Sequence, residues 1–229
     1  SQWKIPQSQL GIGDEGLYLY EGYELIRGAD PTLYNAEVPP LGKYAIGASI
    51  VLFGNGYLFG ILTTTAALVV FFFLAKSVLP KSLALATTLL VAIDPLITSQ
   101  FAATMLESLQ LLFFLVTCLF VISLLKQKSV SKTRAFIGAI GAGFGAFSAV
   151  KFPLLSPLLG ACIGYMIWQK TKRISLIALF FLVSFEDYLA PYLRYFSLGH
   201  TLFEWLGVQK WIINFYLHSN LMPNVGSFA

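Results

Sequence analysis

The sequence predicts an all-α, polytopic membrane protein with about six transmembrane helices and an outer-face N-terminal loop that carries amphipathic helices. Hydrophobic residues make up 57% of the 229 residues. Charged residues make up only 11%, whereas soluble domains contain about 25%. Apolar runs close to bilayer length alternate with short polar segments, and charges of opposite sign collect on alternate segments. A soluble domain of this size would need far more polar surface.

The chain divides into three parts by composition. Residues 1–55 are mixed and polar, hold six of the eleven acidic residues, and are expected to form the first outer loop. Residues 193–229 are expected to lie at the membrane interface, because the stretch 202–217 is amphipathic and contains Trp205 and Trp211. Between them, residues 56–192 are expected to form the transmembrane bundle, from the apolar runs 56–75, 82–97, 101–125, 135–150, 152–168 and 174–185. Asp94-Pro95 breaks the second run near its end, and Glu107 falls in the first turns of the third.

Six spans place the basic and acidic residues on opposite sides. One side receives nine basic residues and no acidic residue, namely Lys76, Lys81, Lys126, Lys128, Lys132, Arg134, Lys170, Lys172 and Arg173. Loops rich in Lys and Arg face the cytoplasm, so residues 1–55 are expected outside. The expected location is the plasma membrane of a prokaryote or otherwise the endoplasmic reticulum. Since these cations lie in short loops, they do not indicate a nucleic-acid partner.

Several of the predicted spans are short. A helix of about 16 residues reaches only ~24 Å, less than a hydrocarbon core of ~30 Å. Short spans that end in charged residues predict either a water-filled hollow at the outer side or charges that simply sit at the interface. In this topology the chain begins outside with no helix before it, so we expect a fragment or an earlier helix carried elsewhere.

Two motifs in the first outer loop are candidates for chemistry. Asp14 and Glu15 precede an amphipathic stretch, where they either cap a helix or present a general base to the membrane surface. Pro39-Pro40-Leu41-Gly42-Lys43 sets the entry into the following helix, with Lys43 in its first turn. The alternative for Lys43 is a plain entry turn with a lysine that extends towards the interface.

Three later segments carry further polar candidates near the same side. Gln100 lies in the polar turn before Glu107. Lys151 ends a Gly-rich run, where it could meet a lipid phosphate or pair with Glu107 or Asp94. Tyr216 and His218 end the amphipathic stretch, and such residues are usually interfacial anchors. No His, Cys or Asp cluster has the spacing of metal ligands, and Gly138, Gly141 and Gly145 have the spacing of a helix-packing face.

In this order, the features resemble the protein O-mannosyltransferase group of the C-type, polyprenyl-phosphate-dependent glycosyltransferases. The most specific part of the resemblance is the acidic pair Asp14-Glu15 followed by the Pro39–Lys43 turn. The Gln100 and Glu107 segment, the Gly-rich run that ends at Lys151, and the aromatic segment that ends in Tyr216 and His218 follow in the same order.

The resemblance implies a multi-helix fold with an outer catalytic cavity. It implies inverting transfer of a sugar, with mannose favoured, from a polyprenyl-phosphate carrier to a hydroxyl of a protein or glycan acceptor. Asp14 would be the base, and Glu15 would position the acceptor or the sugar. The implied contacts with sugar and carrier are Lys43, Gln100, Glu107, Lys151, Arg194, Tyr216 and His218. No cofactor is implied, although Asp14 and Glu15 could bind a divalent metal weakly together with substrate.

The sequence departs from the family pattern at three positions. Val38 stands where the family often has His, and Glu107 where it usually has Asp. Ala102 stands where the family usually has an arginine that meets the phosphate, so Lys151 or Arg194 would have to supply that cation. An alternative is therefore a non-catalytic membrane subunit of a larger complex, derived from the same fold. A transporter would require inverted repeats, and the sequence shows no convincing internal repeat.

Overall fold

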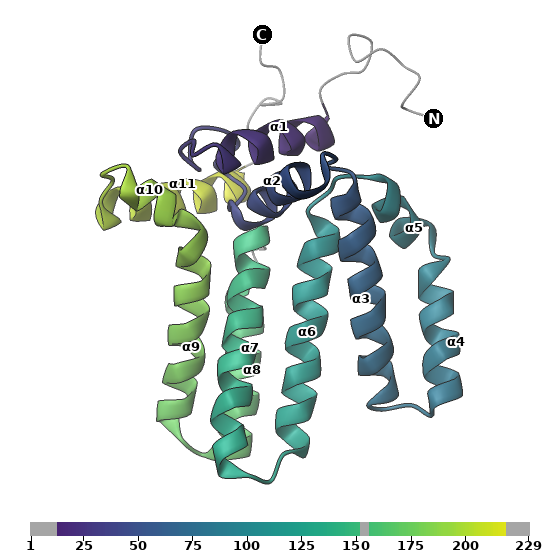
Figure 1. Ribbon diagram of the computed structural model, residues 1–229. Coiled ribbons are helices and arrows are strands. Elements are labelled where there is room, and N and C mark those ends of the chain that lie inside the picture. Colours follow the sequence, from purple (N-terminus) through teal and green to yellow (C-terminus); the bar gives the residue numbers. More distant parts are fainter. Residues whose placement is uncertain (1–12, 152–155, 219–229) are drawn as a thin grey trace.

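The computed structural model describes residues 13–151 and 156–218, and these form helices without strands (Figure 1). The predicted all-α membrane fold is confirmed. In chain order, the elements are α1 (Asp14–Ile26), α2 (Leu41–Phe53), α3 (Leu58–Lys76), α4 (Lys81–Ala92), α5 (Pro95–Ala102), α6 (Glu107–Lys126), α7 (Val130–Val150), α8 (Ser156–Thr171), α9 (Ile174–Leu189), the 3₁₀ turn η3 (Ala190–Tyr192), α10 (Leu193–Ser197) and α11 (Leu202–His218).

Four of the described helices are long and apolar enough to cross a membrane: α3, α6, α7 and the continuous stretch Ile174–Ser197. The pair α4 and α5 gives a fifth if it is one span, bent by 65°. Asp94 causes this break as predicted, because its carboxylate caps α5 by accepting from the Leu96 amide at 2.9 Å, and Pro95 follows. The helix α8 has only 16 residues and is not among these candidates, so the described residues give four or five candidate spans where about six were expected.

The long helices stand side by side, and the shorter helices lie across one end of them (Figure 1). We call this end, which carries α1, α2, α5, α10 and α11, the α1 end. The links between α3 and α4, α6 and α7, and α8 and α9 lie at the opposite end, here called the basic end. The nine basic residues grouped by the sequence all fall at the basic end, so the predicted separation of charge holds in three dimensions.

The bundle packs around α7, whose neighbours are α6 and α9. Glycines make this contact close: a β-carbon on Gly141 would lie 2.9 Å from the Phe180 carbonyl oxygen, and one on Gly145 would meet Ser184. Gly138, the third member of the predicted packing face, has nothing within 4 Å. The packing role expected of this face therefore belongs to Gly141 and Gly145.

At the α1 end, α1 packs directly on α2 through a second pair of glycines. A β-carbon on Gly22 would lie 2.8 Å from the Gly47 amide nitrogen, and one on Gly47 would meet the Gly22 carbonyl. A small apolar core beneath this contact joins Tyr18 and Ile46 to Leu106 and Val150. The contact and the core together hold α1 over the ends of α6 and α7.

Candidate functional site

The two carboxylates of the predicted catalytic pair occupy the first turn of α1, and neighbouring helical residues point about 100° apart. Asp14 is exposed. One oxygen of Glu15 accepts a hydrogen bond from the Thr104 amide at 3.0 Å, which fastens α1 to the link before α6. Asp14 is therefore the carboxylate with free access to solvent, while Glu15 also has a structural contact.

Tyr18 connects Asp14 with the start of α6. This phenol lies one turn after Asp14 and is 3% exposed. Burial raises the pKa of Tyr18, and the negative charges of Asp14 and Glu107 raise it further. Tyr18 also shares an apolar core with Leu106 and Val150, the residues that precede Glu107 and Lys151, so the start of α1 packs against the ends of α6 and α7.

Glu107 is the first residue of α6 and pairs with Lys151, which follows the last residue of α7. The expectation that Glu107 would lie within the first turns of a helix beginning at residue 101 is wrong, because residues 95–102 form α5 and a short link precedes α6. At the helix start, the carboxylate is favoured by the helix dipole. Lys151 Nζ donates to Glu107 Oε1 at 2.6 Å, and Gln110 Nε2 donates to the Lys151 carbonyl at 2.6 Å.

The Glu107–Lys151 pair remains accessible, with side-chain exposures of 41% and 32%. Such a pair contributes only about 0–1 kcal/mol to stability. The second oxygen of Glu107, Oε2, accepts no hydrogen bond within the described residues. Lys151 is thus a reachable cation whose position is set by a neighbouring carboxylate.

The end of α11 approaches the same place. Burial raises the pKa of Tyr216, and the charges of Glu37 and Glu107 raise it further. His218 is exposed, and its Nδ1 lies 2.9 Å from the Asn214 carbonyl oxygen one turn earlier. We call Asp14, Tyr18, Glu107, Lys151 and Tyr216 the carboxylate cluster.

Lys43 occupies a different environment from the one predicted for a carrier-binding residue. Its side chain is fully buried, and Nζ contacts Glu21 Oε2 at 3.1 Å. The same nitrogen donates to the carbonyl oxygens of Tyr34 at 3.1 Å and Asn35 at 2.7 Å. Two of the three ammonium hydrogens therefore have backbone partners, and the ion pair with Glu21 ties α1 to α2. A residue with no exposed surface cannot meet a membrane-bound carrier in this conformation.

Gln100 is also separated from the carboxylate cluster. It lies on α5, which packs against α3 and α4 rather than α7. Its Oε1 is buried and accepts no hydrogen bond within the described residues. The structure pairs Glu107 with Lys151 and packs the helix that carries Asp14 beside them, whereas Lys43 and Gln100 lie outside that group.

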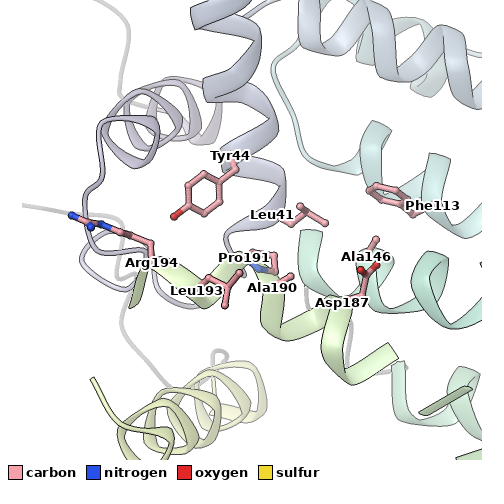
Figure 2. A pocket seen from close by; sticks show the side chains of 9 residues that line it. All are labelled: Leu41, Tyr44, Phe113, Ala146, Asp187, Ala190, Pro191, Leu193 and Arg194. Carbon is pink, nitrogen blue, oxygen red and sulfur yellow. The ribbon is translucent and has the colours of Figure 1, made fainter. Parts of the chain in front are cut away.

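A hollow of about 540 Å³ opens between α2, α6, α7 and the end of α9. Most of its wall is apolar, from Leu41, Phe113, Ala146, Ala190, Pro191 and Leu193. Figure 2 shows Arg194 at one side, near the Tyr44 hydroxyl, and Asp187 at the other side, near Ala146. Arg194 Nε donates to the Gly28 carbonyl at 2.7 Å and Nη1 to Ser197 Oγ at 3.5 Å, so Nη2 remains for a ligand.

The comparison with known families gives one match. Residues 37–186, more than half of the chain, match the dolichyl-phosphate-mannose-protein mannosyltransferase family. The chain belongs to this family. No curated protein and no solved structure is significantly similar to the chain. Membership in the mannosyltransferase family makes the chain a glycosyltransferase of mannosyltransferase type, and the apolar helices place it in a membrane.

The mannosyltransferase match covers only part of the candidate site. Glu107 and Lys151 lie inside residues 37–186, whereas Asp14, Glu15, Arg194, Tyr216 and His218 lie outside. The two parts of the site are nevertheless joined by packing, because Tyr18 on α1 shares an apolar core with Leu106 and Val150, which precede Glu107 and Lys151. Within the described residues, no group of three or more His, Cys, Asp and Glu side chains is placed to hold a metal ion.

Asp187 is the site residue that sequence reasoning missed. It follows the predicted span 174–185, and its side chain lines the hollow. No ion pair or hydrogen bond partner for its carboxylate occurs within the described residues. The sequence signal was available in part, because an acid beside an apolar helix usually faces a polar cavity.

Proposed function

We propose that the chain transfers a sugar, with mannose favoured, from a polyprenyl-phosphate carrier to an acceptor hydroxyl at the α1 end. The observation that carries this proposal is the carboxylate cluster, in which the helix of the exposed Asp14 and the Glu107–Lys151 pair are linked by the apolar core around Tyr18. A base, a cation and an adjacent apolar hollow are the parts that a lipid-linked sugar donor requires. The positive-inside rule makes this end extracytoplasmic.

The proposed reaction divides its work among these side chains. Asp14 accepts the proton of the acceptor hydroxyl as the acceptor oxygen forms a bond to the anomeric carbon. On the opposite face of the sugar, the bond between that carbon and the phosphate oxygen breaks, so the configuration inverts. The electron pair of that bond leaves with the polyprenyl phosphate, whose charge Lys151 stabilises.

Glu107 has a second task in this scheme. It holds Lys151 at 2.6 Å while no phosphate is bound. When the donor phosphate takes over Lys151, Glu107 becomes free to accept hydrogen bonds from sugar hydroxyls. Ala102, at the end of α5, stands where the family usually has an arginine that meets the phosphate. In this scheme the second cation for the phosphate is therefore Arg194 at the hollow. The apolar wall of the hollow accommodates the carrier end of the donor.

The direct test is sugar transfer by the full-length protein in lipid nanodiscs. The donor is radiolabelled polyprenyl-phosphate mannose, and the acceptors are Ser/Thr peptides and oligosaccharides. We expect label in an acceptor only when the donor is present, and NMR of the product should show the anomeric configuration opposite to that of the donor. Absence of transfer from folded protein with every acceptor would contradict the proposal and favour the non-catalytic subunit.

Asp187 is expected to contribute to donor binding. A hydrogen bond to a charged group is worth about 1.5–3 kcal/mol, so Asp187→Ala should raise the KM for the donor about ten- to a hundredfold, with a smaller change in kcat. The measurement is initial rate against donor concentration. Glu186→Ala is the matched control, because Glu186 is the preceding acid, is exposed and does not line the hollow. Equal donor KM values for the two variants would show that the donor does not bind in the hollow.

A further inference from the structure

A second hollow lies at the basic end, on the opposite side of the molecule from the carboxylate cluster. It has a volume of about 350 Å³ and lies between the α6–α7 link, the start of α7, and the α8–α9 link. Its polar lining comes from three cations and three neutral side chains, namely Lys128, Lys170, Arg173, Gln127, Thr133 and Thr171. Leu176 contributes apolar wall.

The hollow carries concentrated positive charge without compensation. The basic end contains no acidic residue, and none of the ion pairs in the described part of the chain includes Lys128, Lys170 or Arg173. Lys170 Nζ donates to the Leu125 carbonyl at 2.7 Å, which fixes its position without neutralising its charge. Three cations that share one concave surface favour an anionic ligand over water alone.

Among the neutral side chains, Gln127 leaves a hydrogen-bond donor for a ligand. Gln127 Oε1 accepts from the Lys128 amide at 2.8 Å and the Ser129 amide at 3.0 Å, so its side-chain NH₂ remains. Thr133 and Thr171 donate their hydroxyl hydrogens to backbone carbonyls one turn earlier, so these hydrogens are not offered to a ligand. The chemistry that complements this lining is an oxyanion with several acceptor oxygens, such as a phosphate.

The position of the hollow indicates how the phosphate arrives. It opens at the ends of α6, α7 and α9, which are candidate membrane spans. Exposed apolar side chains stand beside it, including Leu125, Trp168 and Ile174. Basic hollows between transmembrane helices at this level bind anionic lipid headgroups. We propose that the basic hollow binds the phosphate of an anionic phospholipid whose acyl chains lie along these apolar side chains.

The experiment compares two variants that lose the same charge at the same end. Lys128→Gln/Arg173→Gln removes two cations from the hollow and keeps the bond from Lys170 to Leu125. Lys76→Gln/Lys132→Gln removes two exposed cations that do not line it. Full-length protein is placed in phosphatidylcholine nanodiscs with or without phosphatidylglycerol, and native mass spectrometry counts the phosphatidylglycerol molecules that stay bound. Inorganic phosphate is tested as a competitor.

A cation of the hollow that contacts the lipid phosphate is expected to contribute about fivefold in affinity, or about 1 kcal/mol, so the hollow variant should bind phosphatidylglycerol about 25-fold more weakly. Lys76 and Lys132 lie outside the hollow and act on its ligand only through a field that salt screens, so the control variant should bind only slightly more weakly. Equal losses in the two variants would show a diffuse surface field and overturn the proposal. Displacement of phosphatidylglycerol by inorganic phosphate at equal concentration would assign the hollow to a soluble anion and would also overturn it.

Discussion

Asp14→Asn is expected to lower the rate of sugar transfer by about 10²–10⁴-fold, the usual contribution of a positioned general base. The amide has the shape of the carboxylate but cannot accept the acceptor's proton at neutral pH. The fold should persist, because Asp14 is exposed and its contribution at the start of α1 is about 0.3–1 kcal/mol. The measurement is kcat at saturating donor and acceptor, with the thermal stability of each preparation recorded alongside.

Glu24→Gln provides the control for Asp14→Asn. Glu24 lies on the same helix, ten residues later, which is about 15 Å along the axis. Glu24→Gln removes the same charge from α1 at a site away from Tyr18, so the transfer rate of this variant should stay within about twofold of the parent. If Asp14→Asn retains the parent rate, the base is another carboxylate, and Glu107 is the next to be tested because its charge also raises the pKa of Tyr18.

Lys43→Met is expected to destabilise the α1 end by about 3–5 kcal/mol, because breaking a buried ion pair leaves its partner charged and unpaired. Glu21 would remain buried at 0% exposure without its cation, and two backbone carbonyls would lose their donor. Burial lowers the pKa of Lys43 and raises the pKa of Glu21, because desolvation disfavours each charged form, so each group depends on the other to stay ionised. Thermal unfolding in detergent, together with the rate of proteolysis within α1, measures the loss.

Two comparisons identify the origin of that loss. Lys151→Met removes a cation from a pair whose side chains are 32% and 41% exposed, and should cost no more than about 1 kcal/mol. The double variant Glu21→Leu/Lys43→Met removes both charges and should recover part of the stability, since apolar replacement of a buried pair is often neutral. Recovery should be incomplete because the carbonyls of Tyr34 and Asn35 stay unpaired. A Lys43→Met protein as stable as the parent would mean that Glu21 finds another partner.

The features that depend on local chemistry were predictable from the sequence. Asp94-Pro95 predicts a helix break because aspartate caps helix N-termini and proline lacks an amide hydrogen, and the structure has the break there. The distribution of lysine and arginine predicted which links share an end, and the topology confirms it. Lys151 was expected near Glu107 as one of three alternatives, and they pair at 2.6 Å.

The features that depend on contacts between distant segments were not predictable. Nothing in the spacing of Glu21 and Lys43 distinguishes a buried pair from two surface charges, because the difference arises when α1 docks on α2. The late start of α6 at Glu107 reflects a link whose Thr104 amide is satisfied by Glu15 from another helix. Asp187 became a candidate only when the wall of the hollow was assembled from four helices.

The backbone contact between Gly22 and Gly47 couples α1 to α2 as one unit, and Asp14 lies at the first residue of α1. Side-chain contacts can yield by changing rotamer, but a contact between main chains cannot. The position of Asp14 therefore depends on the orientation of α2, and a change that tilts α2 must also move Asp14 relative to the other site residues. Displacements of about 1 Å can lower the rate a hundredfold. The orientation of α2, which bears no proposed catalytic group, would therefore determine the rate of sugar transfer.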